Sequence, residues 1–324
     1  MDTPDPCLRK LKQLLLTLQE DDLQHEDLNL AGSMEQASQQ LRLNFESTGG
    51  YSSSQGAQTP PITLDNLPGR GIGVIATRLI PAGSIILKEK AILTVPEPLN
   101  KAIIPDFVTN LVDHYTTLPA ALRQQLLGLH AYTRPAQDKA IRNFLDAGSG
   151  DFNLTEQQID FVVRLHSIFA TNSFETTQST RSLYLGTSRF NHSCVPNCNY
   201  DHTLEDSLTK ITVCSSRDIQ PDEEITLSYL NIYDPRDQRQ ACTKLIWGFL
   251  CNCPACDMAD PAVDTILHEQ RLAEYRQLKQ DSYLTMYRNA HVMSLEDADE
   301  VLHRSTRRAQ IAEMLGDNYH MLRE

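Results

Sequence analysis

Three cysteines lie close together in the last third of the chain, where Cys251, Cys253 and Cys256 form a Cys-x-Cys-x-x-Cys run. Thiolates at this spacing are typical zinc ligands, and a closed structural zinc site takes four ligands in a tetrahedron, with Zn–S distances of about 2.3 Å. The run supplies three ligands. The pattern therefore predicts a structural metal site whose fourth ligand comes from elsewhere in the chain; the alternative is three ordinary buried cysteines.

Two further segments carry polar groups that could act on a ligand. Residues 191–197 read Asn-His-Ser-Cys-Val-Pro-Asn, and residues 222–229 read Asp-Glu-Glu-Ile-Thr-Leu-Ser-Tyr. An isolated Asn-His pair is more often a satisfied polar turn than a ligand site, and Asn-His-Ser also matches a glycosylation sequon, which has no meaning without secretion. Each segment is weak evidence alone, so the prediction depends on their order and spacing relative to the cysteines.

A glycine-rich segment lies upstream, where residues 69–73 read Gly-Arg-Gly-Ile-Gly. A dinucleotide-binding fingerprint of the form Gly-x-Gly-x-x-Gly follows a strand. Here the third glycine of that pattern is missing and Leu67-Pro68 precedes the segment, so we exclude a Rossmann-type site. Taken alone, the segment is best interpreted as a plain tight turn.

In this order, the four segments resemble the SET-domain lysine methyltransferases, and in detail the SET core of the SET-and-MYND branch. The resemblance covers residues 67–257. It implies a β-rich α+β fold in which residues 191–194 are threaded beneath residues 223–229 in a pseudoknot. It also implies methyl transfer from S-adenosylmethionine to lysine side chains of histone or non-histone protein. The MYND finger of that branch is absent, because residues 97–165 contain no cysteine.

The resemblance assigns roles to individual residues. It places at the cofactor Arg70, Gly71, Ile72, Asn172, Asn191, His192, Tyr229 and Phe249. It gives the catalytic role to Tyr229, and it lines the lysine channel with Phe174, Tyr229 and Trp247. The zinc ligands that it implies are Cys194, Cys251, Cys253 and Cys256, with Cys198 as the rival for the place of Cys194.

The implied reaction is an in-line displacement on a sulfonium, so most of the acceleration must come from alignment of nucleophile, methyl and leaving sulfur. A free lysine amine has a pKa of about 10.4. A narrow apolar channel beside a cationic sulfonium would lower that pKa through desolvation and like-charge repulsion, so no dedicated general base is required. Trp247 departs from the resembled family, which commonly has a tyrosine there; the alternative is that Trp247 is a core residue.

The elements that would position these residues follow from periodicity and turn signals. Residues 1–61 contain one amphipathic helix, with leucines recurring from Leu8 to Leu18, and a flexible linker rich in Gly, Ser and Pro. Residues 62–257 form the SET domain, with strand-like runs, a helical insertion at 97–170 and the zinc-binding post-SET segment at 247–257. Residues 258–324 form a C-terminal helical segment of two or three helices, with a capping-box start at Ser294.

Composition limits the partners. Lys and Arg total 29 against 42 Asp and Glu, a net charge of −13, which disfavours direct contact with nucleic acid and favours a basic, lysine-containing protein or peptide. A merely soluble acidic surface is an equal alternative. No apolar stretch approaches the ~20 residues of a membrane span, and no signal peptide is recognisable. We therefore expect a monomeric protein of the nucleus, the cytoplasm or both, with reduced cysteines and no membrane binding.

Two functions from different classes remain open. The favoured one is a protein-lysine methyltransferase, because a module that needs only the fold has little use for Asn191, His192 and Tyr229 together. The alternative is a SET-fold binding or scaffold protein with weak or lost methyltransferase activity. Trp247 is the one feature that favours this alternative.

Overall fold

The computed structural model describes residues 6–18, 20–23, 61–96, 104–147, 154–177, 180–202, 209–259, 264–288 and 293–315. The chain divides into two compact units. Unit 1 comprises residues 1–73, 85–189 and 200–213, and unit 2 comprises residues 74–84, 190–199 and 214–324. The predicted linker before residue 61 lies outside the described residues. None of the helices in the described part is both long and apolar enough to cross a bilayer.

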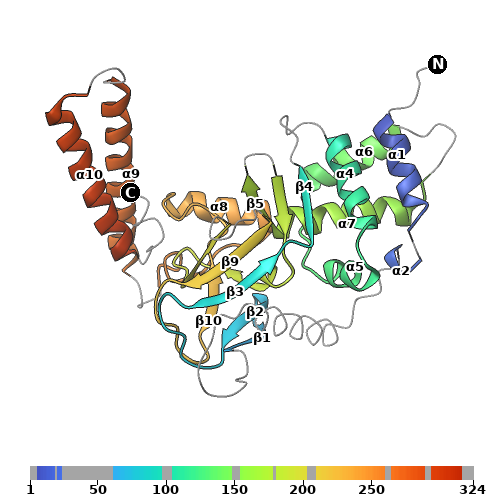
Figure 1. Cartoon of the computed structure of the whole chain (residues 1–324), viewed down its shortest axis with the longest axis horizontal. Coiled ribbons are helices and arrows are strands. Elements are labelled where there is room, and N and C mark those ends of the chain that lie inside the picture. Colours follow the sequence, from blue (N-terminus) through green and yellow to red (C-terminus); the bar gives the residue numbers. More distant parts are fainter. Residues whose placement is uncertain are drawn as a thin grey trace. The chain divides into compact units, whose positions relative to one another are not determined.

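Unit 1 contains a group of helices around an apolar core (Figure 1). These helices are α1 (Pro6–Leu15), α2 (Glu20–Leu23), α4 (Ile104–Thr116), α5 (Ala120–Leu127), α6 (Pro135–Ala147) and α7 (Glu156–Asn172). The leucines that predict the N-terminal helix form its buried face, since Leu8, Leu11 and Leu15 are 3%, 0% and 1% exposed and belong to this core. Helix α2 is anchored by Asp22, which accepts a hydrogen bond from Tyr115 Oη at 2.7 Å. The N-terminal segment thus contributes to the core of unit 1.

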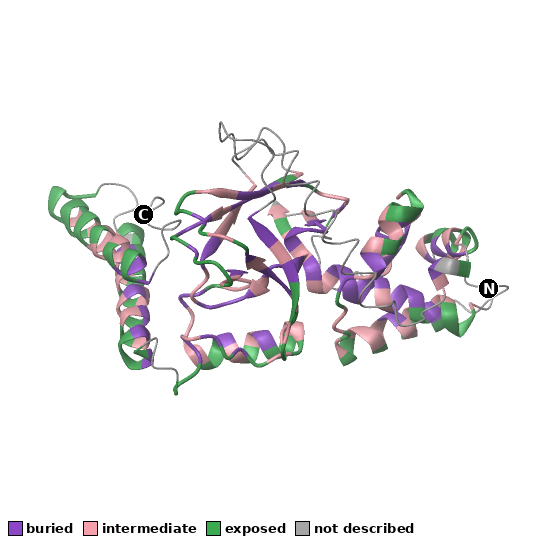
Figure 2. Ribbon diagram, turned by 90° about the horizontal axis from the view of Figure 1, so that it is seen from below, coloured by how far each residue is buried: buried purple, intermediate pink, exposed green. Residues whose placement is uncertain are grey.

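Helix α7 runs through this core and is buried along most of its length (Figure 2). It begins with a capping box: Thr155 Oγ1 accepts from Gln158 N at 3.2 Å, and Gln158 Oε1 accepts from Thr155 N at 3.0 Å. Phe161, Leu165 and Ile168 are fully buried on its inner side. The sequence prediction of this helix is confirmed, and its last residue leads directly into a strand.

The strands form three small sheets with the orders β1-β2-β10-β7, β3-β9-β8 and β4-β6-β5. Their bounds are β1 (Ile62–Leu67), β2 (Gly71–Ala76), β3 (Ile85–Lys90), β4 (Leu93–Pro96), β5 (Ser173–Thr177), β6 (Thr180–Leu183), β7 (Asn191–His192), β8 (Cys198–Asp201), β9 (Lys210–Ser215) and β10 (Glu224–Leu227). Alternating burial along β1 and β4 fits strands with one covered face. The strand-like runs of the sequence are confirmed as β2, β3, β9 and β10.

Strand β10 makes two different pairings in unit 2. It is antiparallel to β2, and it is parallel to β7, with Thr226 opposite Asn191 and Leu227 opposite His192. The parallel ladder continues where Ser193 N–H donates to Leu227 O at 3.0 Å. Parallel neighbours cannot be joined by a tight turn. This pairing therefore brings together the two polar motifs at 191–197 and 222–229, which are distant in sequence.

The C-terminal part of unit 2 is helical, with α8 (Arg236–Trp247), α9 (Thr265–Arg288) and α10 (Leu295–Met314). Helices α9 and α10 form an antiparallel hairpin, drawn in red in Figure 1. Ser294 caps α10 by accepting a hydrogen bond from Asp297 N at 3.0 Å. The Tyr233 ring stacks on Tyr275 of α9, with centroids 3.8 Å apart. The predicted α+β fold with a helical insertion and C-terminal helices is confirmed.

Candidate functional site

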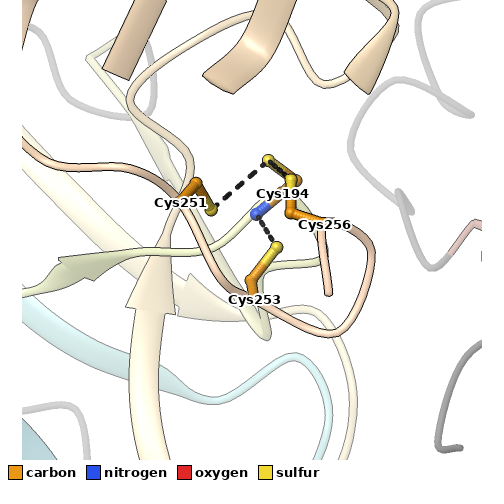
Figure 3. A group of neighbouring side chains, drawn as sticks. All are labelled: Cys194, Cys251, Cys253 and Cys256. Atoms are coloured by element: carbon orange, nitrogen blue, oxygen red, sulfur yellow. Dashed lines mark hydrogen bonds between the residues drawn. The ribbon is translucent and has the colours of Figure 1, made fainter. Parts of the chain in front are cut away.

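The four predicted metal ligands lie together in unit 2 (Figure 3). The buried Sγ atoms of Cys194, Cys251, Cys253 and Cys256, hereafter the four-cysteine cluster, all lie within 4.8 Å of one another. Cys194 Sγ is 3.9 Å from Cys251 Sγ and 3.6 Å from Cys256 Sγ. A Zn–S distance of about 2.3 Å corresponds to an S···S edge of about 3.8 Å in a regular tetrahedron. The donor set and its spacing therefore fit a zinc ion.

Cys198, the rival fourth ligand, is not a member of this group. It lies in β8 and is fully buried, and burial raises the pKa of its thiol above the ordinary value. Its exclusion rests on position, because it lies outside the group of sulfurs that approach one another within 4.8 Å. Among the described cysteines, Cys194 is the one that joins the C-terminal run.

One face of helix α8 holds the cysteine run in place. Arg236 Nε donates to Cys256 O at 2.7 Å, and Gln240 Nε2 donates to Cys251 O at 2.8 Å. These residues are four positions apart, so they project from the same side of the helix. Gly248 then ends α8 at a φ of 80°, a left-handed conformation that favours glycine. The chain consequently turns from the helix directly into the cysteine run.

His192 connects the four-cysteine cluster to Tyr229. The Tyr229 backbone N–H donates to His192 Nδ1 at 3.2 Å, and His192 Nε2 lies 3.3 Å from Cys194 Sγ. Because the backbone amide can only donate, Nδ1 must carry a lone pair, and the proton of the neutral ring must be on Nε2. His192 therefore donates to the Cys194 sulfur. It is 2% exposed, so this geometry is shielded from water.

Tyr229 lies at the end of β10 among aromatic rings. Its Oη donates to Phe190 O at 2.6 Å, and its ring centroid is 5.3 Å from that of His192 and 5.3 Å from that of Trp247. Phe249 lies on the other side of His192, at 6.1 Å between centroids. Tyr229, Trp247 and Phe249 are all half-buried. Unit 2 thus brings together the predicted catalytic tyrosine, one predicted channel residue and Phe249, a predicted cofactor residue.

Two side chains that the sequence reasoning left without a role brace the motif crossing. Asn197 Nδ2 donates to Glu224 O at 2.9 Å, and Asn197 Oδ1 accepts from Thr226 N at 2.8 Å. Glu224 Oε1 accepts from Asn191 Nδ2 at 2.9 Å. Both residues lie inside the two motifs, so their position in the sequence could have indicated a role. Their hydrogen-bond partners could not be predicted without the β7–β10 register.

Unit 1 contains the other predicted site residues. Gly71 begins β2 at a φ of 71°, and a Cβ there would meet nothing within 4 Å, so only its backbone conformation favours glycine. Arg70 N donates to Leu67 O at 3.0 Å in the preceding turn, and Ile72 is half-buried in β2. Asn172 is buried, and its Nδ2 donates to His130 O and to Ile168 O, each at 2.7 Å. The described contacts of Asn172 thus fix the end of α7.

Phe174, the predicted channel residue of unit 1, belongs to an aromatic group. Its ring meets Tyr184 edge-on at 5.8 Å and Tyr200 at 5.1 Å, and Tyr200 lies 5.7 Å from His202. Burial raises the pKa of Tyr184 to about 12, so its hydroxyl stays protonated. Reasoning from sequence missed Tyr184, Tyr200 and His202, because isolated aromatics carry no signal of such a group.

Glu89 was also missed, and it is a buried carboxylate in β3. Its oxygens accept from Gly186 N at 2.8 Å, Thr187 N at 2.9 Å and Thr187 Oγ1 at 2.9 Å. Burial raises the pKa of Glu89, while these hydrogen bonds oppose the rise. The contacts hold the 3₁₀ turn Thr187–Arg189, which directly precedes the 191–197 motif in sequence.

Comparison with known proteins gives the class of fold. Residues 71–230 match the family model of the SET domain. This part of the chain is therefore similar to SET domains, and the β7–β10 pairing lies within the matched residues.

Two of the similar proteins are histone-lysine methyltransferases by name, and a third is named for its SET domain and zinc finger. The chain is similar to the histone-lysine N-methyltransferase set5 of Schizosaccharomyces pombe, 31% identical over 109 residues that cover 33% of this chain and 34% of that protein. It is 36% identical over 101 residues to SET5 of Eremothecium gossypii, covering 31% of this chain and 19% of that protein. It is also similar to the SET domain and MYND-type zinc finger protein 6 of S. pombe, 37% identical over 71 residues, 21% of this chain and 14% of that protein.

The match thus spans about a third of the first relative and less of the other two. Among solved structures, the SET domain of LSMT bound to lysine and AdoHcy covers 90% of this chain and 90% of that chain. The two are 11% identical, with a TM-score of 0.45.

Proposed function

We propose that this protein is a protein-lysine N-methyltransferase that uses S-adenosylmethionine. The observation that carries the proposal is the parallel pairing of β7 with β10, which sets Asn191 and His192 beside a strand that ends two residues before Tyr229. The SET-domain match supports it, and so do the names of the similar yeast proteins.

The donor set of unit 2 fits such a cofactor. Phe249 offers a half-buried aromatic face for an adenine, and Asn191 offers an amide whose carbonyl oxygen can accept from the ligand, since its Nδ2 is bound to Glu224. Aromatic faces also attract a sulfonium cation, an interaction worth roughly 0.5–2 kcal/mol. S-adenosylmethionine would supply an electrophilic methyl group. We assign Arg70, Gly71, Ile72 and Asn172 to the same cofactor from the sequence motif.

The hydroxyl of Tyr229 would orient the lysine amine. Its only proton is donated to Phe190 O at 2.6 Å, so the oxygen presents lone pairs to any other neighbour. Such a lone pair would accept from an amine N–H, which would orient the amine and turn its nitrogen lone pair away from Tyr229. Alignment of this kind is the main source of acceleration in such a displacement. Trp247 and Phe174 would wall the channel.

The substrate would be a lysine-containing protein with a basic surface. The net charge of −13 favours approach of such a partner over nucleic acid. The similar yeast proteins are named histone-lysine methyltransferases, and histones combine basic charge with a nuclear location. We therefore propose a nuclear substrate of the histone class, met by a monomeric enzyme.

The test is Tyr229→Phe, with Tyr233→Phe as the matched control. Tyr229→Phe keeps the ring and removes the hydroxyl that would hold the amine, so turnover on histone should fall by about 10²–10³, the usual cost of losing one preorganised polar group. Tyr233 lies four residues away and stacks on Tyr275, so Tyr233→Phe should keep nearly full activity. Mass spectrometry of the substrate measures both. Equal rates for Tyr229→Phe and wild type would refute the catalytic assignment.

The second candidate is a SET-fold scaffold protein without turnover, and Trp247 favours it because it supplies no hydroxyl at its place beside Tyr229. Calorimetric titration with S-adenosylmethionine separates the two functions. An enzyme binds the cofactor and labels a substrate. A scaffold transfers no methyl group to any basic protein of a cell lysate.

A further inference from the structure

Arg239 of α8 is a fully buried cation whose nearest anionic neighbours are the four-cysteine cluster and Glu269 of α9. Its side chain is 0% exposed, and it is the largest fully buried side chain of the described residues. Arg239 Nη2 lies 3.9 Å from Cys256 Sγ and donates to Glu269 Oε1 at 3.0 Å. A buried charge is tolerated when it is paired and hydrogen-bonded. The groups around the Arg239 guanidinium therefore indicate which negative charge it compensates.

Two backbone carbonyls bind the Nη atoms of the guanidinium, whereas its buried Nε has no hydrogen-bond partner among the described residues. Arg239 Nη1 donates to Asp234 O at 2.6 Å, and Nη2 also approaches Ala255 O at 3.3 Å. Ala255 precedes Cys256, and Asp234 lies in the segment that follows β10. The Arg239 side chain therefore binds both the last turn of the cysteine run and that segment. Glu269 adds a second bond from α9, since Glu269 Oε2 accepts from Arg236 N at 3.2 Å.

Charge arithmetic gives Arg239 a role. A zinc ion bound by four thiolates carries a net charge of −2, because four negative sulfurs outweigh one divalent cation. Burying that charge without a counter-charge is costly. Glu269 alone does not account for the burial of the Arg239 charge, because the Glu269 side chain is 29% exposed and can be solvated. One arginine beside the sulfurs offsets half of the cluster's charge.

We propose that Arg239 is a positioning residue that compensates the charge of the metal-loaded cluster, and that Glu269 of α9 holds Arg239 in place. The inference rests on the proposed zinc site. It adds that the first helix of the C-terminal hairpin takes part in metal retention. The Arg239 guanidinium lies 3.9 Å from Cys256 Sγ, so its positive charge offsets part of the negative charge of the loaded cluster.

Four variants of the full chain separate charge from packing. Arg239→Met keeps most of the volume and removes the charge, whereas Arg239→Lys keeps the charge with different hydrogen bonds. Glu269→Gln leaves Arg239 in place and weakens its anchor. Glu274→Gln is the control, because Glu274 pairs with Arg307 on the exposed side of the same helix, with side chains 42% and 36% exposed.

The readout is zinc affinity and the rate of zinc transfer to a colorimetric chelator at pH 7, with cobalt(II) substitution to report the thiolate spectrum. Loss of a residue that supports a metal ligand typically costs 10–100-fold in metal affinity. We expect such a loss for Arg239→Met, a smaller loss for Arg239→Lys, faster zinc release for Glu269→Gln, and wild-type behaviour for Glu274→Gln.

Equal losses in Arg239→Met and Arg239→Lys would overturn the charge role. If Arg239→Met fails to fold, Glu269→Gln decides: release at the rate of the Glu274→Gln control would also overturn the proposal. If the wild-type chain binds no zinc, the zinc assignment itself is wrong. If the wild-type chain binds zinc and the Arg239 and Glu269 variants bind and release it as wild type does, only the role of Arg239 is wrong.

Discussion

Two buried regions of this molecule owe their stability to different chemistry. The helical core of unit 1 gathers more than twenty apolar side chains from α1, α4, α5, α6, α7 and the neighbouring strands. One buried cluster of unit 2, separate from the apolar cluster around Tyr233 and Tyr275, consists of the four cysteines and Ala255, with Val195 and Phe249 at its edge. Burial of apolar area contributes about 25 cal/mol per Å². The first region can be stable on that basis, whereas the second contains little apolar surface.

The two regions require different surroundings. The helical core needs only complementary shape and hydrophobicity. Removing part of one apolar side chain should therefore lower stability in proportion to the volume removed. The four-cysteine cluster needs a cation, because four adjacent thiols gain little from packing alone, and it needs the donors around it. His192 donates to Cys194, and the Cys194 N–H donates to Cys253 Sγ at 3.3 Å. These contacts connect the metal site to the strand crossing and to Tyr229.

The largest expected effect is that of metal removal. Structural zinc sites contribute on the order of 10 kcal/mol of apparent folding free energy in small domains. Stripping zinc, or the substitution Cys251→Ser, should abolish binding of S-adenosylmethionine, because His192 would lose the anchored Cys194 sulfur beside it.

Hydrogen exchange should then show loss of protection in residues 190–199 and 247–259, with α7 still protected. Cys242→Ser is the matched control, since Cys242 lies outside the four-cysteine cluster. Metal-free protein that still binds the cofactor with full affinity would contradict the expectation.

The next effect tests the contrasting region, through α1. Leu11 is 0% exposed in the core of unit 1, whereas Leu16, just beyond the helix, is 68% exposed. Leu11→Ala should lower the free energy of unfolding by about 2–5 kcal/mol. Leu16→Ala should change it by less than about 0.5 kcal/mol. Denaturant unfolding measures both; the same value for the two variants would mean that α1 stands outside the cooperative core.

The sequence predicts the two regions unequally well. Leucine periodicity identifies α1, and the capping residues identify α7 and α10, because these signals are local. The four-cysteine cluster needs Cys194, which is 57 residues from Cys251 in the chain. Only the resemblance of the Asn-His-Ser-Cys motif pointed to it, since spacing alone could not choose between Cys194 and Cys198.

The supporting residues of the site were harder to predict. Arg239 is one of several charged residues in α8, and Glu269 is one of several in α9. Nothing in a helical pattern distinguishes a buried arginine from a solvated one. Their partnership depends on how α8 and α9 contact the cysteine run, which is a tertiary property. The same holds for Glu89, whose partners lie nearly a hundred residues away.

A smaller effect concerns pH and the helical core. Burial, together with the charge of Arg134, lowers the pKa of His166 to about 4, below its ordinary value of 6.5. His166 therefore stays neutral in the folded state while the unfolded chain binds a proton as pH falls below 6.5. The free energy of unfolding should fall by about 1.4 kcal/mol per pH unit between pH 6.5 and pH 4, and level off below.

Between pH 7 and pH 5 this contribution amounts to about 2 kcal/mol. His166→Leu should remove it, so the variant loses less stability than wild type over that interval. His303→Leu, in the exposed part of α10, is the control and should follow wild type. Denaturation curves at the two pH values decide the matter. Parallel behaviour of wild type and His166→Leu would show that His166 is accessible to protons in the folded state.

The smallest effect lies at the border between the metal cluster and the proposed cofactor site, where Phe249 packs against both the cysteines and His192. Its half-buried ring offers one face to an adenine, and such stacking is worth roughly 0.5–2 kcal/mol. Phe249→Ala should weaken binding of S-adenosylmethionine by a few-fold up to about thirty-fold. Zinc content should stay at the wild-type level, because Phe249 donates no ligand atom.

Leu250→Ala is the matched control, since Leu250 is adjacent in the chain and 63% exposed. Calorimetric titration gives the affinity, and elemental analysis gives the zinc content of the same samples. Loss of zinc together with the cofactor would mean that Phe249 acts through packing on the cysteines and not through stacking. An unchanged titration curve would remove Phe249 from the cofactor site. The expected combination, weaker cofactor binding with full zinc, would separate the cofactor site from the metal site by a single side chain.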